Sequence, residues 1–356
     1  MANQLPEQII RALKRGQVIP ACPLALNSRR QLDERRQRAL VRYYLDSGAG
    51  GLAVGVHTTQ FAIRDPKIGL FQPVLEIVAE EMDRADRKRN EPVIRIAGVC
   101  GATSTAVREA ELVRDHGYHA ALVSFGAMQG ANDDELIAHC RAIAEIIPFF
   151  GFYLQPAVGG RVLPFSFWRR LAGIENLAAI KIAPFNRYQT LDVIRAFVEA
   201  GRFDTPLYTG NDDNIVMDLV TPFRFQNCQG KVELHIKGGL LGQWAVWTSK
   251  AIEVLDQCHS VVASGGRVPA ELMRLNVELT DVNSAIFDAA NGFAGCIAGI
   301  HEVLRRQGLL EGIWCLEEDT TLSPGQKEEI DRVYVDYPHL NDDTFVRENL
   351  NRWLSS

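Results

Sequence analysis

Eight apolar runs rich in β-branched residues recur along the chain at a pitch of about thirty residues, and this recurrence constrains the fold most strongly. The runs lie at residues 18–19, 51–56, 93–97, 120–123, 149–154, 178–182, 206–209 and 232–236. Stretches with apolar residues at helical spacing separate them, at residues 32–45, 74–82, 105–116, 135–147, 188–198 and 244–255. Eight strand-and-helix units predict an α/β fold, a (β/α)₈ barrel.

The pattern changes after Gln257, where helical spacing continues without a further strand. The predicted helices lie at residues 268–279, 285–291, 296–307, 324–333 and 344–353. Because this tail exceeds what closes a barrel, we expect a barrel over residues 1–260. A helical C-terminal extension over residues 261–356 should pack on the barrel, with a neighbouring subunit as a further surface for it.

Composition excludes several classes of partner. The chain has 356 residues, 47% of them hydrophobic, and a net charge of −6. No basic stripe suits a phosphate backbone, so we expect no nucleic acid partner. No signal peptide or membrane span is visible, and the seven cysteines lack Cys-x-x-Cys spacing. We therefore expect a cytoplasmic protein without membrane, disulfide scaffold or metal site.

Two strand ends carry groups suited to covalent catalysis. In a barrel the reacting groups collect at the C-terminal ends of the strands, where Tyr153 and Lys181 lie. Burial lowers the pKa of a lysine and frees its amine to attack a carbonyl, while a nearby phenol can carry protons. The alternative is a lysine that extends to solvent and a tyrosine that packs in the core.

Other strand ends offer polar groups without a specific pattern. Thr58 and Thr59 follow the second run, and Gly210, Asp212 and Asp213 follow the seventh. The threonine hydroxyls and neighbouring N–H groups suit a small carboxylate. The aspartates suit helix capping equally well. Residues 235–242 end the eighth run with glycines that could open a helix and bind an anion.

These segments together resemble the dihydrodipicolinate synthase and N-acetylneuraminate lyase family of Schiff-base aldolases, from roughly residue 16 to residue 333. His57, Thr58 and Thr59 occupy the place of the family's Gly-Thr-Thr-Gly-Glu motif. Tyr153 begins a segment similar to the Tyr-Asn-x-Pro motif, and Lys181 ends one similar to Ile-Lys. The separation of 28 residues between Tyr153 and Lys181 is the family's interval.

The resemblance implies that Lys181 forms an imine with pyruvate or another 2-keto acid. It implies that Thr58 and Thr59 hold the keto-acid carboxylate and that Tyr153 relays protons. Asp212 and Asp213 lie where the sugar-acid lyases bind sugar hydroxyls. No cofactor is required, because the protonated imine itself withdraws electrons from the neighbouring carbon.

Departures from the family pattern concern the second substrate. Val158 replaces an arginine that dihydrodipicolinate synthases use for a carboxylate, with Arg161 as a possible substitute. His57 and Phe61 replace a glycine and a glutamate, and His57 either meets substrate or packs as a structural ring. No tyrosine follows the fourth strand, although the family usually places one there.

We therefore predict a class I lyase or aldolase that takes a 2-keto acid and an aldehyde, with a keto-deoxy sugar acid as the favoured product or substrate. Dehydration of such an acid uses the same imine. The alternatives are dihydrodipicolinate synthesis from pyruvate and aspartate semialdehyde, and a catalytically altered barrel that only binds a keto acid. The resemblance also implies a homo-oligomer, a tetramer or dimer.

Overall fold

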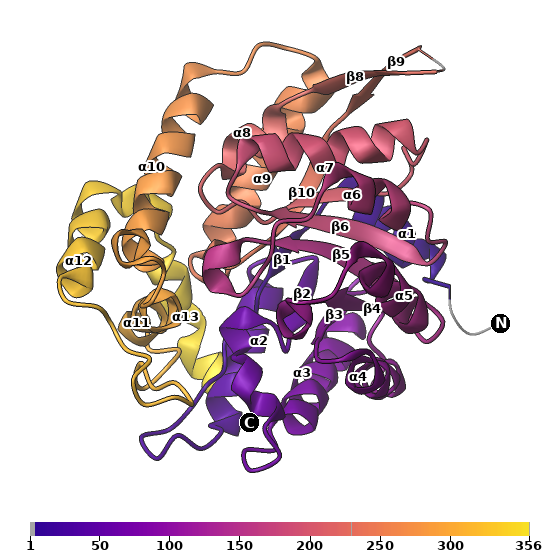
Figure 1. Ribbon diagram of the computed structural model, residues 1–356. Helices are drawn as coiled ribbons and strands as arrows, with labels where there is room; N and C mark the ends of the chain where they lie inside the picture. Colours follow the sequence, from indigo (N-terminus) through magenta and orange to yellow (C-terminus); the bar gives the residue numbers. More distant parts are fainter. Residues whose placement is uncertain (1–3, 229, 356) are drawn as a thin grey trace.

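A closed barrel of eight parallel strands forms the centre of the computed structural model, which describes residues 4–228 and 230–355 (Figure 1). Hydrogen bonds join the strands in the order β1, β10, β7, β6, β5, β4, β3, β2, and a parallel bridge between Ala21 and Ala53 closes the ring. The predicted (β/α)₈ barrel is confirmed. Its strands are β1 (Val18–Pro20), β2 (Gly51–Val54), β3 (Ile94–Val99), β4 (Ala120–Val123), β5 (Phe149–Leu154), β6 (Leu177–Ala183), β7 (Leu207–Thr209) and β10 (Ile236–Leu241).

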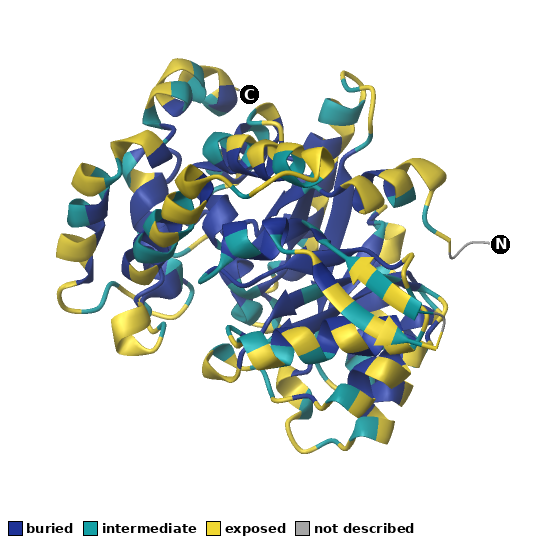
Figure 2. Ribbon diagram, turned by 90° about the horizontal axis from the view of Figure 1, so that it is seen from above, coloured by how far each residue is buried: buried dark blue, intermediate teal, exposed yellow. Residues whose placement is uncertain are grey.

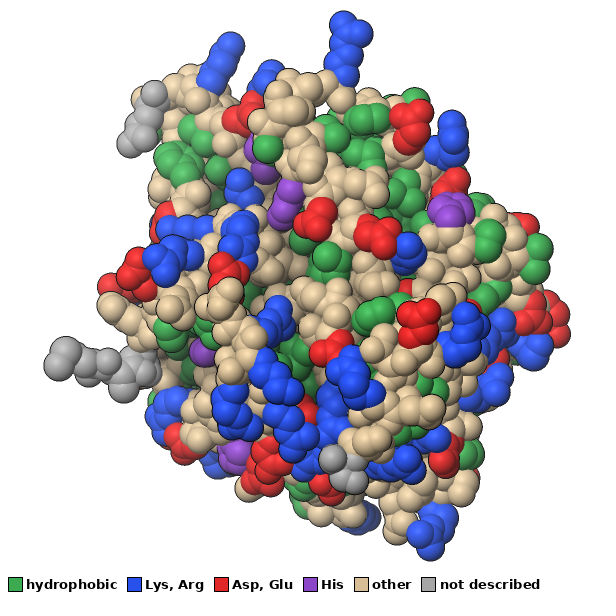
Figure 3. Space-filling view, turned by 180° about the vertical axis from the view of Figure 1, so that it is seen from behind, with side chains coloured by type: hydrophobic (Ala, Val, Ile, Leu, Met, Phe, Trp, Pro, Cys, Tyr) green, Lys and Arg blue, Asp and Glu red, His purple; other side chains and the backbone are tan. Residues whose placement is uncertain are grey.

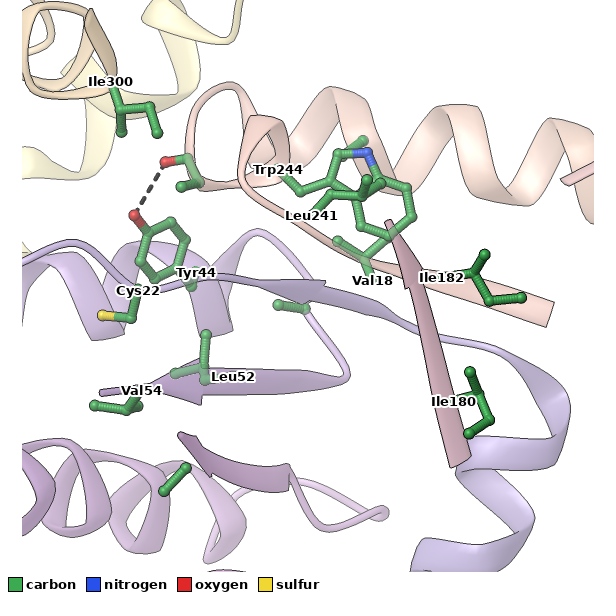
Figure 4. Close-up of a cluster of buried hydrophobic side chains, with 14 of the residues drawn as sticks. Val18, Cys22, Tyr44, Leu52, Val54, Ile180, Ile182, Leu241, Trp244 and Ile300 are labelled. Atoms are coloured by element: carbon green, nitrogen blue, oxygen red, sulfur yellow. Dashed lines mark hydrogen bonds between the residues drawn. The ribbon is translucent and has the colours of Figure 1, made fainter. Parts of the chain in front are cut away.

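Amphipathic helices cover the outside of the barrel, with their buried faces inward and their exposed faces toward solvent (Figure 2). Ile180 and Ile182 of β6 and Leu52 and Val54 of β2 belong to the apolar layer under these helices (Figure 4). Full burial of one such side chain stabilises the fold by about 1.5–3 kcal/mol. The helices are α2 (Glu34–Asp46), α3 (Phe71–Asp86), α4 (Thr103–Asp115), α5 (Asp133–Ala144), α6 (Phe165–Leu171), α7 (Arg187–Glu199), α8 (Ile215–Val220) and α9 (Thr248–Ser264).

An additional helix, α1 (Glu7–Arg15), closes the N-terminal mouth of the barrel. Its Ile9 and Leu13 pack among side chains of the barrel interior. Tyr208 of β7 donates a hydrogen bond to the Leu13 carbonyl at 3.0 Å. No helix was predicted here from the sequence, because a helix this short shows few apolar positions. A cavity lies at the opposite mouth, at the C-terminal ends of the strands.

The position of the eighth strand differs from the prediction. Residues 232–234 belong to an antiparallel hairpin of β8 (Phe223–Asn227) and β9 (Gly230–Leu234), and partly buried and exposed residues alternate along β9. The barrel strand β10 follows the hairpin and contains Gly238 and Gly239. A Cβ at Gly238 would lie 2.5 Å from the Gln17 backbone. The glycines therefore allow close strand packing and do not open a helix, so the predicted anion site at residues 235–242 is not supported.

Four further helices gather at one side of the barrel (Figure 1). They are α10 (Ala270–Ile286), α11 (Cys296–Arg306), α12 (Gln326–Asp336) and α13 (Asp343–Leu354). The predicted helix at 285–291 is the end of α10 followed by a short 3₁₀ turn, η6 (Ala289–Asn291).

Buried hydrogen bonds join α13 and the turn before it to α2. Tyr43 donates to Asp342 Oδ2 at 2.8 Å, and the Trp353 indole N–H donates to Asp46 Oδ2 at 2.6 Å. One apolar cluster runs from the outer barrel layer to Val346 and Trp353. The boundary at residue 260 stays a prediction.

Candidate active site

Lys181 projects into the barrel from β6. Its neighbours Ile180 and Ile182 belong to the outer apolar layer (Figure 4), and successive side chains of a strand point to opposite faces. The register places Lys181 opposite Phe152 on β5 and Tyr208 on β7. The Lys181 Nζ lies 4.5 Å from the centroid of the Phe152 ring. The amine is thus held against an aromatic face inside the barrel.

Gly210, just after β7, leaves the space that the Lys181 side chain occupies. A Cβ at this position would lie 2.6 Å from Lys181 Cε and 2.7 Å from the Ala183 Cβ. Both distances are far shorter than a normal carbon contact of about 3.5–4.0 Å. The structure therefore places Gly210 against Lys181, where the glycine has a steric role; substrate binding by Gly210 stays a prediction.

Burial changes the protonation of Lys181. Removal from water disfavours the ammonium and lowers the pKa of Lys181 below its ordinary value, although the nearby Asp212 carboxylate partly offsets this shift. Lys181 carries its amine on the wall of an internal cavity of about 70 Å³. A larger fraction of neutral amine is the form that attacks a carbonyl carbon.

Asp212 is the acidic partner of Lys181 in this cavity. Burial raises the pKa of Asp212, while the hydrogen bond from the Gln243 N–H and the Lys181 charge oppose the rise. The Gln243 N–H donates to Asp212 Oδ1 at 2.9 Å. Among the described residues no hydrogen bond reaches Oδ2. An amine and a carboxyl group whose proton affinities have approached one another can exchange a proton near neutral pH.

A buried polar cluster fixes the loop that carries Gly210 and Asp212. The side chain of Asp218 in α8 is fully buried and pairs with Arg187. It also accepts hydrogen bonds from the Thr209 hydroxyl at 2.6 Å and the Asn211 amide at 2.9 Å. A buried carboxylate with several donors holds one geometry, because loss of any donor leaves charge uncompensated. Sequence analysis missed Asp218.

His57 also lines the cavity, from the 3₁₀ turn η1 (His57–Thr59) after β2. Burial, and secondarily the Lys181 charge, lower the pKa of His57 to about 4. The imidazole is therefore neutral at pH 7. Its ring centroid lies 6.2 Å from that of Phe61, which leaves both the substrate-facing and the packing interpretation open.

The two threonines of η1 are placed differently. Thr58 lines the cavity and donates its hydroxyl hydrogen to the Ala21 carbonyl at 2.9 Å. Thr59 is fully buried behind it and donates to the Cys22 carbonyl at 2.7 Å. These bonds join the β2 loop to the end of β1. Of the pair, the structure brings only Thr58 to Lys181.

Tyr153 is not brought to Lys181. Tyr153 follows the inward-facing Phe152 along β5, so its side chain points to the outer layer. Its ring packs 5.0 Å from that of Trp168, and its hydroxyl accepts from the Leu163 N–H at 3.2 Å. The motif spacing located the strand correctly, but alternation along the strand decides which side chain faces inward. The expected phenol beside the amine is replaced by the Phe152 ring.

Asp213 also lies outside the Lys181 cavity. It borders an adjacent cavity with Thr280 of α10, whose hydroxyl donates to the Asp213 carbonyl at 2.9 Å. The Asp213 Oδ1 is buried without a hydrogen-bond partner among the described residues, and burial raises the pKa of Asp213. Asp212 lines both this cavity and the cavity of Lys181, whereas Asp213 lines this cavity alone of the two.

The C-terminal extension supplies part of the cavity wall. Phe287 at the end of α10, Phe293, and Cys296 at the start of α11 face the same cavity as Lys181. Phe185, which follows β6, joins them, and its ring lies 5.8 Å from that of Phe293. Nothing in the local sequence indicates that residues near position 290 reach the barrel mouth, because only tertiary packing brings them there.

The surface carries charges of both signs. On the face shown in Figure 3, acidic and basic side chains are interspersed. Within residues 4–228 and 230–355, no helix is both long and apolar enough to cross a membrane. The same residues contain no group of three or more His, Cys, Asp or Glu side chains arranged to hold a metal ion.

Comparison with known proteins identifies related sequences and folds. The model of the "Dihydrodipicolinate synthetase family" matches residues 14–221. A 4-hydroxy-tetrahydrodipicolinate synthase of Bifidobacterium longum (strain DJO10A) is 27% identical over 201 residues, which span 55% of this chain and 60% of that protein. The match thus covers less than two thirds of this curated relative.

Two crystal structures share the fold. N-acetylneuraminate lyase from Fusobacterium nucleatum has a TM-score of 0.69 at 17% identity, over 92% of this chain and 99% of that one. Dihydrodipicolinate synthase from Acinetobacter baumannii, complexed with pyruvate, has a TM-score of 0.70 at 19% identity, over 91% and 99%. At these identities the similarity shows the barrel and the helical C-terminal region as a common architecture.

Proposed function

Because the chain belongs to the dihydrodipicolinate synthetase family, we propose that it is a class I lyase or aldolase whose Lys181 forms an imine with pyruvate or a related 2-keto acid. One observation carries the proposal: the Lys181 amine lies inside the barrel beside the Asp212 carboxyl group, and burial lowers the pKa of Lys181. A neutral amine is the form that attacks a carbonyl carbon in imine formation.

The first steps require a proton donor, and Asp212 fits that role. The Lys181 nitrogen attacks C2 of the keto acid, and the proton that the nitrogen then releases goes to the carbonyl oxygen to give a neutral carbinolamine. A proton from Asp212 then lets the hydroxyl leave as water, which gives the protonated imine. The resulting Asp212 carboxylate can take a proton from C3 and produce the enamine. This assignment replaces Tyr153, whose hydroxyl is bonded to Leu163 in the outer layer.

The keto-acid carboxylate would lie on the β2 side of the cavity. Thr58 and His57 supply the polar groups there, and the Thr58 hydroxyl can rotate from the Ala21 carbonyl to the ligand. A neutral imidazole can donate one hydrogen bond. These contacts orient C2 toward the Lys181 nitrogen, and the proposed chemistry uses neither a metal nor an organic cofactor.

Two alternatives are less well supported. Dihydrodipicolinate synthesis would bring a second carboxylate into the cavity, but no described arginine lines it, and Val158 does. The Arg161 guanidinium donates to the Met128 carbonyl at 2.7 Å instead. A barrel that only binds keto acids would not require the pairing of Lys181 with Asp212. Homo-oligomerisation stays a prediction, and the cavity residues named here all come from one chain.

Borohydride reduction tests the proposal. Pyruvate plus borohydride should add one reduced keto-acid unit to the wild-type protein, visible by intact-protein mass spectrometry. Lys181→Arg should take no adduct, since guanidinium stays protonated. Lys237→Arg is the matched control, because Lys237 lies near the opposite end of the barrel on β10 and should not affect the adduct. An adduct that persists in Lys181→Arg would contradict the assignment.

A further inference from the structure

We infer that the aldehyde partner of the Lys181 enamine carries a flat apolar substituent, as an aryl aldehyde does, and that residues of the C-terminal extension select it. This inference rests on the proposed function, and it replaces the hydroxylated partner expected from sequence. The observation behind it is the aromatic character of the cavity wall: Phe185, Phe287 and Phe293 all face the cavity.

Two of the three phenylalanines pack against each other, and the third lines the same cavity. Phe185 and Phe293 meet edge to face, with an interplanar angle of 81°. Phe287 lies against Gly242, where a Cβ would come within 3.0 Å of the ring. All three follow the ends of β6 or α10, beyond the strand positions that carry Lys181. A substituent extending from the enamine toward the barrel mouth therefore meets ring faces and edges, which favour another flat ring.

Two of these phenylalanines have a strained backbone conformation. Phe185 has φ of 51° and Phe293 has φ of 72°, both in the left-handed region that bulky side chains avoid. The Phe185 N–H is fixed by a hydrogen bond of 3.0 Å to Asn211 Oδ1. Asn211 also bonds Asp218, so the cluster that positions Asp212 also positions Phe185. Strained residues of this kind concentrate at ligand-binding sites.

The polar groups of the cavity are too few for a polyhydroxylated partner. Besides Lys181 and Asp212, the polar side chains lining it are His57, Thr58 and Gln155. In the proposed complex the keto acid contacts Lys181, Asp212, His57 and Thr58. Among the described lining residues, Gln155 is then the one polar side chain left to bond hydroxyl groups. Asp213, the expected second acceptor, does not line this cavity but the neighbouring one, which shares Asp212 and the three phenylalanines with it. Hydroxyl groups buried against the phenylalanines would lose water without replacement.

The proposed reaction balances without an oxidant or reductant. C3 of the enamine attacks the aldehyde carbon, a carbon–carbon bond forms, and the carbonyl π bond breaks. The aldehyde oxygen takes a proton from the neutral carboxyl of Asp212. Water then hydrolyses the imine, frees the Lys181 amine and releases a 4-hydroxy-2-keto acid with an aryl group on C4. The reverse sequence cleaves that acid to pyruvate and the aryl aldehyde.

Partner selectivity tests the inference. With the purified full chain and pyruvate, kcat/KM is measured for benzaldehyde and for D-glyceraldehyde by the rate of pyruvate consumption. We expect benzaldehyde to be preferred by at least about tenfold, the scale set by one well-matched apolar contact. Phe185→Ala and Phe293→Ala should each lower that ratio by about tenfold, and Phe185→Leu and Phe293→Leu should lower it less. Tyr188→Ala, at an exposed aromatic residue of α7, is the control that should leave it unchanged.

Borohydride trapping with pyruvate in the same preparations tests the Lys181 imine separately from the choice of aldehyde. Absence of an adduct in the wild-type protein would refute the imine and the inference with it. An intact adduct together with a preference for glyceraldehyde, or with no turnover of benzaldehyde, would overturn the inference alone. An unchanged ratio in all four phenylalanine variants would also overturn it, since the aromatic wall would then have no part in selection.

Discussion

Gly210→Ala should disable imine formation while leaving the fold intact. The new Cβ would lie 2.6 Å from Lys181 Cε, whereas carbon atoms in contact prefer about 3.5–4.0 Å, so the side chain must retreat by about 1 Å. Ala183 blocks part of the space, with its Cβ 2.7 Å from the same position. A misplacement of about 1 Å at a reacting group can cost about 10²-fold in rate. We therefore expect pyruvate trapping to slow by about that factor.

The assay is the rate of borohydride-trapped adduct by mass spectrometry, with unfolding temperature followed by circular dichroism. Gly130→Ala is the matched control, because a Cβ there meets nothing within 4 Å. Each substitution also removes glycine flexibility from the unfolded chain, an effect of about 0.4–1 kcal/mol on stability. Trapping at the wild-type rate in Gly210→Ala would refute the steric account of Lys181.

Further predictions concern the neighbours of Lys181. Tyr153→Phe should lower stability by about 1–3 kcal/mol in chemical denaturation, because the Leu163 N–H loses its buried acceptor, yet leave trapping unchanged; a large loss of trapping would restore the phenol relay. Asp212→Asn should slow trapping by about 10²–10⁴-fold. Because the Asp212 charge raises the pKa of Lys181, the same variant should shift the rising limb of the pH profile to lower pH, and an unmoved limb would exclude their interaction. Because the pKa of His57 lies at about 4, its ring is already neutral near pH 7, and His57→Phe should leave every inflection of the pH profile above pH 6 in place; an inflection that disappears in His57→Phe would contradict this.

Periodicity alone was sufficient to predict the barrel, because buried parallel strands and amphipathic helices leave different apolar spacings. It failed at the eighth strand, where the half-exposed hairpin strand β9 resembles a strand of the barrel. Val232 belongs to β9, and the true strand β10 contains two glycines that close packing requires. Glycines lower the strand signal in a sequence even where the structure needs them.

The site was predictable to the level of the strand ends. Lys181, Gly210, Asp212, Thr58 and His57 do meet at one cavity. The assignment of Tyr153 depended on which of two adjacent aromatic residues faces inward, and spacing between motifs cannot decide this. The phenylalanines from the C-terminal extension could not be found from sequence, because their contact with the cavity depends on long-range packing of α10 and α11.

A crystal structure of the protein with pyruvate, soaked in or bound before crystallisation, would show whether Lys181 forms the imine. We expect continuous electron density from the Lys181 Nζ to C2 of the keto acid, with an Asp212 oxygen within hydrogen-bond distance of the adduct and Tyr153 still bonded to Leu163. Pyruvate bound without a covalent link while Lys181 is neutral, or linked to another lysine, would contradict it.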